Sequence, residues 1–537
     1  MSSAELKAQG NALFSAKNYT EAGDKYSAAI AASDDPKGLA VLYANRAACR
    51  LSLKRYMDAD ADARKATQLD PTYAKAFARL ATAEDAMGQY PKAQQSWQRA
   101  LDALPKANLT PAEGVQKVQY QAGLEAAAAG VAKLQATPIV GARAVGVQGG
   151  GRLPWELAAA MLPRLRLARP VNGDDVYSSA WVIASAYEDF SSGVNKMSQL
   201  KFDEAAQYAR GIPHAVADLT NGIIRDARVI HFTDSEFISK YNRQMGYEIE
   251  ICKPWLEAGP EEVVREAPKR QREQGWVAAR RAVSLTIRTW IMRAVMDAAL
   301  RQRHDVAVEL FKRALDVLRS LRAEWASVPP VDRGVVFEKT FLFGIQRLYI
   351  DSIMQAYALN PDPELLEALA TESDVLISEV DAALREPRAQ PPRDPGFVLS
   401  FYLYPRGLAY AMKGFYYNTK AGLSSNDARE FCRKAAVAYI QAADAFPEDD
   451  EQHPWFLNAA LGNMFTAHAF PLRETLEVMQ RIRLSAPKAK AIWERSSLSA
   501  NGLWGILEGV GRRETELRGR VARGEVGVDE VVGAAGL

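Results

Sequence analysis

The chain of 537 residues is 48% hydrophobic and 25% charged, and its formal net charge is +2. A chain of this length is too long for one hydrophobic core, so we expect roughly three or four domains of ordinary globular composition. The near-neutral charge excludes an overall attraction to nucleic acid or to a membrane surface, so any electrostatic recognition must come from a local patch.

The N-terminus carries no recognisable targeting segment. Met1–Lys7 lacks the apolar core of a signal peptide and is expected to belong to an ordered helix. The chain has no run of about 18 uncharged apolar residues, so no membrane span is expected. Its cysteines (Cys49, Cys252 and Cys432) are far apart and form no CxxC pair, which favours a reducing compartment. Together these features predict a cytoplasmic protein.

Small and large residues recur at fixed spacing in the first 105 positions. Three residues are repeated 34 positions later: Ala59, Ala66 and Pro71 by Ala93, Ala100 and Pro105. An earlier copy, Ala22, Tyr26 and Ala29, has the internal spacing of Ala93, Trp97 and Ala100. The step from the first copy to the second is 37, so we expect about three extra residues in the loop near Ser33–Lys37.

The spacing has a physical reason if each copy is a pair of antiparallel helices. Small residues such as Ala22 let the two helices approach closely, whereas Tyr26 and Trp97 fill the space between neighbours. Proline at positions 71 and 105 ends one unit, because it cannot continue a helix. One pair cannot bury its apolar face alone, so three pairs are expected to stack.

Residues 4–105 resemble the tetratricopeptide-repeat family on these positions. Thr110-Pro111-Ala112-Glu113 follows as a capping box with proline at the first helical position. We therefore expect an additional helix over 111–134 that covers the end of the stack. The predicted domain is 1–134.

Five polar residues lie on the first helices of the three units, where they would face the concave groove of such a stack: Lys7, Asn11, Asn45, Lys75 and Arg79. The two i,i+4 pairs, Lys7 with Asn11 and Lys75 with Arg79, each share one helix face. Three cations and two amides suit a ligand with two close carboxylates, and a C-terminal aspartate supplies both.

The resemblance extends to these five residues. Each of them matches a position of the carboxylate clamp of chaperone adaptors such as the heat-shock organising protein. The resemblance implies binding of the Glu-Glu-Val-Asp terminus of the cytosolic 70-kDa and 90-kDa heat-shock chaperones. Phe14, one turn beyond Asn11, is a candidate for apolar contact with the peptide or for the core. The alternative is a plain solvated surface, which does not explain two asparagines in helix interiors.

The rest of the chain is predicted to be helical. We expect a flexible linker at 135–152, a helical region of unknown role at 153–275, tetratricopeptide-like repeats at 276–518 and a weakly ordered tail at 519–537. The spacing in the repeats is carried by Ala307, Phe311 and Ala314, and again by Gly414, Tyr417, Ala435, Tyr439, Ala442 and Pro447. An irregular all-helical domain is the alternative. The stretch 222–232 could be helix or strand.

Chemical motifs are scarce. The five histidines form no HxH or HxxxH cluster, and there is no GxSxG, phosphate-binding loop or kinase signature. We therefore expect no metal, no cofactor and no enzyme activity. The segment Leu153-Pro154-Trp155-Glu156-Leu157, with Met161, Leu162 and Leu165, faintly resembles the start of an F-box.

The sequence thus predicts an all-α protein, an α-solenoid of tetratricopeptide repeats that acts as a co-chaperone-type adaptor. The first domain would bind a chaperone tail, and the second a client or another partner protein. A general repeat scaffold that binds another acidic C-terminal peptide is one alternative, and an F-box-like ubiquitin-ligase adaptor is another.

Overall fold

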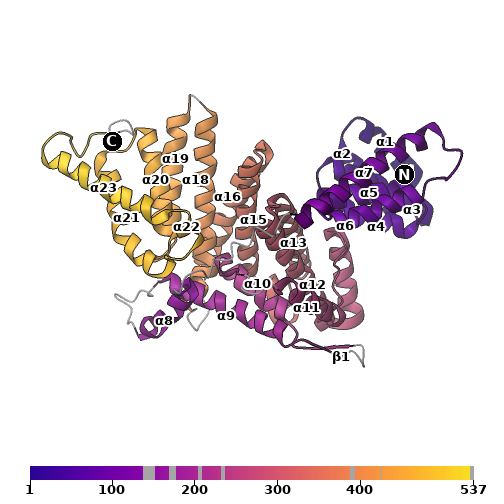
Figure 1. Ribbon diagram of the computed structural model, residues 1–537, viewed down its shortest axis with the longest axis horizontal. Helices are drawn as coiled ribbons and strands as arrows, with labels where there is room; N and C mark the ends of the chain where they lie inside the picture. The colour runs from indigo at the N-terminus through magenta and orange to yellow at the C-terminus, as the bar shows by residue number, and fades with distance from the viewer. Residues whose placement is uncertain are drawn as a thin grey trace. The chain divides into compact units, whose positions relative to one another are not determined.

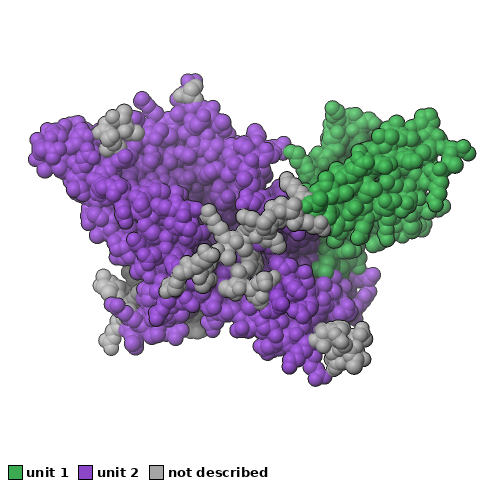
Figure 2. Space-filling model, in the orientation of Figure 1, with its two compact units in different colours: residues 1–140, 255–266 green, residues 141–254, 267–537 purple. Residues whose placement is uncertain are grey.

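A computed structural model describes residues 1–136, 152–167, 177–203, 208–231, 236–386, 394–424 and 426–532. The chain forms two compact units (Figure 2). Unit 1 consists of residues 1–140 and 255–266, and unit 2 of residues 141–254 and 267–537. The predicted linker at 135–152 lies mostly outside the described residues.

Unit 1 begins with seven helices, which pack in chain order as antiparallel neighbours (Figure 1). Their bounds are α1 Ser3–Ser15, α2 Tyr19–Ala31, α3 Pro36–Ser52, α4 Tyr56–Leu69, α5 Ala74–Ala86, α6 Tyr90–Asp102 and α7 Pro111–Ala136. The predicted three helix pairs and the predicted additional helix are therefore present.

Small residues bring the paired helices of unit 1 together. A Cβ added to Gly10 on α1 would lie 2.7 Å from the Tyr26 ring of α2, and one added to Gly123 on α7 would lie 2.5 Å from Trp97. Side chains of Ala22, Ala59 and Ala93 are fully buried. The predicted small-to-large packing is confirmed.

One expectation about the repeat spacing is wrong. The extra residues between the first two copies do not form a longer loop, because Asp35 caps a helix that starts at Pro36. That helix, α3, has 17 residues, whereas α1 and α5 have 13 each. The Asp35 side chain accepts from the backbone N–H groups of Lys37 and Gly38, which stabilises the earlier start.

Residues 255–266 complete unit 1 from a distant part of the sequence. Glu261 approaches Arg50 at 2.9 Å and Arg46 at 3.5 Å, and Val263 is fully buried. Arg46 and Arg50 each also contact Asp62 on α4, at 2.8 and 2.7 Å. The repeats thus share an ion-pair network with a segment that lies beyond position 250.

Unit 2 is almost entirely helical. Its longer helices are α8 Pro154–Leu167, α9 Ser179–Ser198, α10 Ala215–Arg225, α11 Phe237–Cys252, α12 Pro260–Arg301 (of which 260–266 belong to unit 1), α13 His304–Glu324, α15 Lys339–Leu359, α16 Pro363–Arg385, α18 Tyr404–Leu423, α19 Ala428–Asp444, α20 Gln452–Ala467, α21 Leu472–Trp493 and α23 Leu503–Ala522. Shorter elements are α14 Pro330–Arg333, α17 Pro395–Val398, α22 Ser497–Ala500, the 3-10 turns at Ala227–Val229 and Val335–Phe337, and a π-helical turn, η4, at Leu399–Leu403.

A two-stranded antiparallel hairpin interrupts the helices of unit 2. It consists of β1 Lys201–Asp203 and β2 Tyr208–Arg210. The sequence left the stretch 222–232 open between helix and strand. Its described part, 222–231, ends α10 and continues into a 3-10 turn. α12 bends at Gly275, whose φ is 80°.

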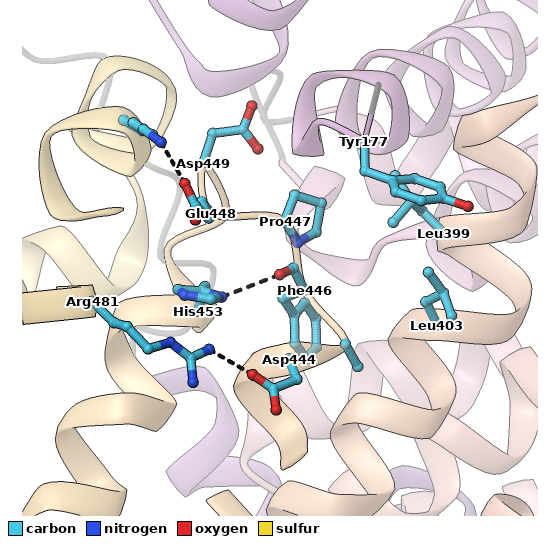
Figure 3. Close-up of a pocket in the computed structure, with 12 residues that line it drawn as sticks. Tyr177, Leu399, Leu403, Asp444, Phe446, Pro447, Glu448, Asp449, His453 and Arg481 are labelled. Carbon is cyan, nitrogen blue, oxygen red and sulfur yellow. Dashed lines mark hydrogen bonds and ion pairs between the residues drawn. The ribbon is translucent and has the colours of Figure 1, made fainter. Parts of the chain in front are cut away.

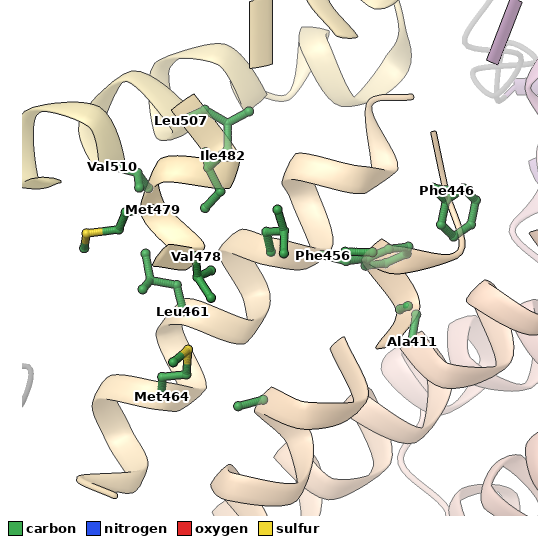
Figure 4. Close-up of a cluster of buried hydrophobic side chains, with 14 of the residues drawn as sticks. Ala411, Phe446, Phe456, Leu461, Met464, Val478, Met479, Ile482, Leu507 and Val510 are labelled. Atoms are coloured by element: carbon green, nitrogen blue, oxygen red, sulfur yellow. The ribbon is translucent and has the colours of Figure 1, made fainter. Parts of the chain in front are cut away.

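Helices α15, α16, α18, α19, α20, α21 and α23 stack as successive neighbours (Figure 1). A Cβ on Gly414 of α18 would lie 2.8 Å from the Tyr439 ring of α19, which repeats the relation of Gly10 to Tyr26. Their common core lies across α18 to α23 (Figure 4), and the labelled side chains are Ala411, Phe446, Phe456, Leu461, Met464, Val478, Met479, Ile482, Leu507 and Val510. The predicted second helical array is present.

The predicted weakly ordered tail is wrong for most of its length. Positions 519–522 complete α23, and the chain then returns to the start of α21. Val531 forms a bridge with Pro471, and the Leu472 N–H donates to the Glu530 carbonyl at 2.8 Å. Positions 533–537 lie outside the described residues.

Candidate functional site

The predicted recognition residues lie on the first helix of each pair in unit 1. Lys7 and Asn11 are on α1, Asn45 is on α3, and Lys75 and Arg79 are on α5. Asn11 and Lys75 are exposed, and the other three are half-buried. We call these five residues the polar site.

Hydrogen bonds join three of the five side chains. Arg79 Nη1 donates to Asn45 Oδ1 at 3.3 Å, and Asn45 Nδ2 donates to Asn11 Oδ1 at 3.4 Å. The structure therefore brings together one residue from each of the three first helices. Lys7 lies one helical turn before Asn11 on α1, and Lys75 lies one helical turn before Arg79 on α5.

In the described part of the chain, the three cations of the polar site lack the carboxylate partners that other arginines on α3 and α4 have. Arg46 and Arg50 share Asp62, and Arg64 contacts Asp60 at 2.9 Å. Within the described residues, by contrast, no carboxylate lies within ion-pair distance of Lys7, Lys75 or Arg79. Lys7 and Arg79 are half-buried, and a half-buried cation loses solvation that no carboxylate among the described residues replaces.

Burial is the main influence on Arg79. It lowers the pKa of the guanidinium, and the nearby groups that act against burial are the Tyr73, Tyr120 and Tyr26 side chains and Cys49, with no carboxylate among them. Among the described residues, Arg79 is therefore a partly desolvated cation without a carboxylate beside it.

Phe14 is half-buried and is the sixth predicted residue. Its ring packs edge-on against Tyr19 with a centroid distance of 5.3 Å, and it borders the core formed by α1, α2 and α3. The side chain thus has a packing role, and its contact with a peptide stays a prediction.

Sequence reasoning missed one member of the site. The hydroxyl of Tyr26 on α2 donates to Asn11 Oδ1 at 2.7 Å. Tyr26 was assigned only to packing, because the repeat pattern requires a large residue there. The neighbouring Gly10 is the one signal that could have indicated this contact, since it lets the tyrosine ring lie against α1.

A cavity of about 450 Å³ lies in unit 2 (Figure 3). Leu399, Leu403 and Phe446 form its apolar part. Its cations are already paired with carboxylates that line the same cavity, Arg481 with Asp444 at 2.5 Å and Lys488 with Glu448.

The histidine of this cavity is held in place by the backbone. His453 Nδ1 lies 2.9 Å from the Ala443 carbonyl and 3.2 Å from that of Phe446, and burial lowers the pKa of the ring. Because both of its cations are paired, this cavity, unlike the polar site, offers no cation that lacks a carboxylate partner.

The segment with F-box resemblance is part of the core of unit 2. Trp155 is 2% exposed and stacks on Tyr187 and His231, and Leu153 is 8% exposed. Glu156 accepts a hydrogen bond from the Leu153 N–H at 2.7 Å and so caps α8. These side chains explain the local sequence through packing and capping.

The described residues offer neither a metal site nor a membrane-spanning helix. No group of three His, Cys, Asp or Glu side chains is arranged to hold a metal ion. Among the helices that are described, none is long and apolar enough to cross a bilayer.

Three stacked helix pairs followed by a covering helix, with the small-to-large packing described above, define unit 1 as a tetratricopeptide-repeat domain.

No family model matches the chain. Individual curated proteins do match part of it. "Heat shock protein STI1" of Saccharomyces cerevisiae is 38% identical over 114 residues, which are 21% of this chain and 19% of that protein. "Hsp70-Hsp90 organizing protein" of Triticum aestivum is 37% identical over 168 residues, 31% of this chain and 27% of the relative.

Among solved structures, the second tetratricopeptide domain of human RPAP3 "in complex with HSP70 peptide SGPTIEEVD" is 31% identical. It covers 22% of this chain and 92% of that chain, with a TM-score of 0.19. The first curated relatives are thus matched over about a fifth to a quarter of their own length. The likeness to these two relatives extends over 21% and 31% of this chain, and their names concern heat-shock proteins.

Proposed function

We propose that this chain is a cytoplasmic, non-enzymatic co-chaperone-type adaptor. The polar site would bind the C-terminal Glu-Glu-Val-Asp tail of 70-kDa or 90-kDa heat-shock chaperones, and unit 2 would bind a client or another partner protein. The observation that carries the proposal is the set of three cations, Lys7, Lys75 and Arg79, that lack a carboxylate partner in the described structure. Three other arginines of unit 1, Arg46, Arg50 and Arg64, have one.

The chemistry of the ligand follows from the donors. Lysine and arginine donate charge-assisted hydrogen bonds to carboxylates, and the asparagine amides add neutral donors. A C-terminal aspartate supplies two carboxylates a few ångströms apart, one from the side chain and one from the main chain. The relatives named for heat-shock proteins and for the organisation of Hsp70 and Hsp90 support the chaperone tail as the source of this terminus.

Calorimetric titration of the full chain with Met-Glu-Glu-Val-Asp tests the proposal. We expect a Kd on the order of micromolar, which corresponds to about −8 kcal/mol. The same peptide with a C-terminal amide should bind far more weakly, because one carboxylate is lost. Lys75→Ala should cost about 1.5–3 kcal/mol of binding free energy, with unchanged helix content because Lys75 is exposed.

A second outcome distinguishes the general scaffold. If the chain binds a different acidic C-terminal peptide with free acid but ignores Met-Glu-Glu-Val-Asp, the polar site is a carboxylate site with another partner. If neither free acid binds, the five residues are a solvated surface and the proposal fails.

A further inference from the structure

The asparagines of the polar site have a fixed orientation, and the reason lies in the hydrogen-bond chain. An arginine guanidinium can only donate hydrogen bonds. Asn45 must therefore present its oxygen to Arg79, which directs its Nδ2 group toward Asn11. Asn11 must in turn present its oxygen to Asn45. One donor-only group thus determines which way both amides face.

Tyr26 completes this arrangement from the opposite side. A tyrosine hydroxyl can donate or accept, but Asn11 already presents Oδ1, so the hydroxyl donates to that oxygen at 2.7 Å. The side chain is 2% exposed, and burial raises the pKa of the phenol to about 12, so its proton stays in place at physiological pH. Asn11 Oδ1 therefore accepts two hydrogen bonds, one from Tyr26 and one from Asn45.

The Asn11 amide nitrogen is left with both protons available. In the part of the chain that the structure describes, it makes no hydrogen bond, and the Asn11 side chain is exposed. We propose that Tyr26 is a positioning residue of the polar site, which holds the Asn11 oxygen inward so that its NH2 group donates to the ligand's carboxylate. This inference rests on the proposed function and adds to it a residue on the second helix of the pair.

The advantage is preorganisation. In some of its rotamers, an unrestrained asparagine amide would present its oxygen to an incoming carboxylate. That oxygen carries partial negative charge and repels an anion. With the oxygen occupied by two donors, only the attractive orientation remains, and the ordering is complete before the ligand arrives. Loss of the hydroxyl should thus weaken binding without any change in the residues that contact the peptide.

The test is a double-mutant cycle on the full chain with Met-Glu-Glu-Val-Asp as free acid. Tyr26→Phe keeps the ring against Gly10 and removes only the hydroxyl. It should weaken binding about 5- to 10-fold, as expected for one lost hydrogen bond. Asn11→Ala should also weaken binding, and Tyr26→Phe should then add less than about twofold in the Asn11→Ala background, because the group that it positions is gone.

A matched control is available in the same unit. Tyr19→Phe removes a hydroxyl for which no hydrogen bond is found within the described residues, and its ring lies against Phe14 rather than Asn11. We expect this variant to bind with wild-type affinity. Thermal unfolding of each variant reports whether a loss of binding follows from a loss of fold.

The outcomes separate the two proposals. If the wild-type chain binds the free acid but Tyr26→Phe binds equally well, the positioning role is overturned and the proposed function stands. An equal loss from Tyr26→Phe in the wild-type and Asn11→Ala backgrounds also overturns it, because the tyrosine would then act through the fold. If the wild-type chain does not bind, the proposed function fails, and the inference fails with it.

Discussion

Arg79 combines two properties that oppose each other in a folded protein. It is half-buried, which costs solvation energy, and its only polar contact among the described residues is the neutral Asn45 oxygen. A residue that stabilised the fold would have an acidic partner, as Arg50 has in Asp62. We infer that Arg79 is retained for binding at some expense of stability.

Arg79→Met should therefore separate binding from folding. It should weaken binding of the free-acid peptide by about 1.5–3 kcal/mol, while the melting temperature stays the same or rises, because a partly desolvated charge is removed. Calorimetric titration and thermal unfolding of the full chain measure both quantities.

The matched substitution Arg50→Met should lower the stability of the fold and leave peptide binding unchanged. It breaks a buried ion pair and leaves Asp62 with Arg46 alone, so we expect a loss of roughly 3 kcal/mol of stability. Peptide affinity of the folded protein should be unchanged. A large drop in melting temperature for Arg79→Met would contradict this account of the two arginines.

The sequence was sufficient for the residues of the polar site and insufficient for their connections. Lys7, Asn11, Asn45, Lys75 and Arg79 could be selected because repeat spacing places each on a first helix. The Tyr26 hydroxyl could not be selected, because the repeat pattern requires only a large side chain at that position. Trp97 meets the same requirement in the third copy, and its indole N–H contacts Asp85 instead. Repeat periodicity specifies size and not hydrogen-bonding partners.

At the scale of the helix pair, Gly10 controls how closely α1 and α2 approach. An added methyl group would lie 2.7 Å from Tyr26 Cε1, so the ring must move. Alanine raises helix propensity by about 1 kcal/mol over glycine, whereas overpacking costs about 1–3 kcal/mol. The second effect should prevail.

We therefore expect Gly10→Ala to lower the melting temperature and to weaken peptide binding, because the Tyr26 hydroxyl moves away from Asn11. Gly114→Ala on α7 is the control, since no atom lies within 4 Å of its added Cβ. Thermal unfolding should show no loss for this variant. Destabilisation of equal size at both positions would mean that the close approach at Gly10 is unimportant.

In unit 2, α16 and α18 are aligned by a ladder of ion pairs at seven-residue spacing. The pairs are Arg406 with Asp381 at 2.7 Å, Lys413 with Asp374 at 2.5 Å and Lys420 with Glu367 at 2.6 Å. A seven-residue step is two helical turns, so the same faces meet at each rung. The ladder specifies the register of these antiparallel helices.

Reversal of the middle rung tests this role. Lys413→Glu or Asp374→Lys alone should each cost about 0.5–1 kcal/mol through like-charge contact at a partly exposed pair. The double variant should recover most of that loss, because the pair is restored with opposite polarity. Urea unfolding at low and high salt measures the effect, which should shrink as salt screens the charges. Additive losses in the double variant would show that the rung is not a pair.

At the scale of the whole chain, a buried charged cluster joins distant segments of unit 2. Arg228 contacts Asp226 at 2.7 Å, Asp450 at 2.8 Å and Glu451 at 3.4 Å, and it lies 3.8 Å from the Trp493 ring centre. One guanidinium thus faces three carboxylates. Burial raises the pKa of Glu451 to about 7, although Arg228 opposes the shift.

This shift predicts a direction of pH dependence. A carboxyl whose pKa is higher in the folded state than in the unfolded state binds protons preferentially when folded. Its contribution to stability is therefore complete below about pH 4.5 and is lost as the pH rises toward 7. The hydroxyl of Ser496 and the Arg228 guanidinium remain in contact with the carboxylate after it ionises.

Glu451→Gln imitates the protonated form at every pH. Relative to the wild type, its melting temperature should rise by about 1 °C between pH 5 and pH 8, the effect of roughly 1 kcal/mol in a unit of this size. Differential scanning fluorimetry over that range measures the difference. A constant difference at all pH values would place the pKa of Glu451 outside the range.

The predicted fold was correct at the level of helices and repeats but not in the assignment of residues to units. Local patterns such as the Thr110–Glu113 capping box determine where a helix begins, and both ends of that contact lie within four residues. Pro260 likewise begins α12, but no local signal indicates that residues 255–266 belong to unit 1. Their place in unit 1 depends on contacts between Glu261 and arginines about 210 positions earlier, which repeat spacing does not encode.

Unit 1 is consequently a discontinuous domain, and this affects how it can be transplanted. A fragment that ends at position 136 retains every residue of the polar site but removes Glu261 from Arg46 and Arg50, and Glu257 from Arg64. Grafting the repeats onto another protein would therefore require both chain segments, joined by a new connection. Modular exchange of this domain would need two insertion points in the host, so recombination at a single boundary would deliver an incomplete copy.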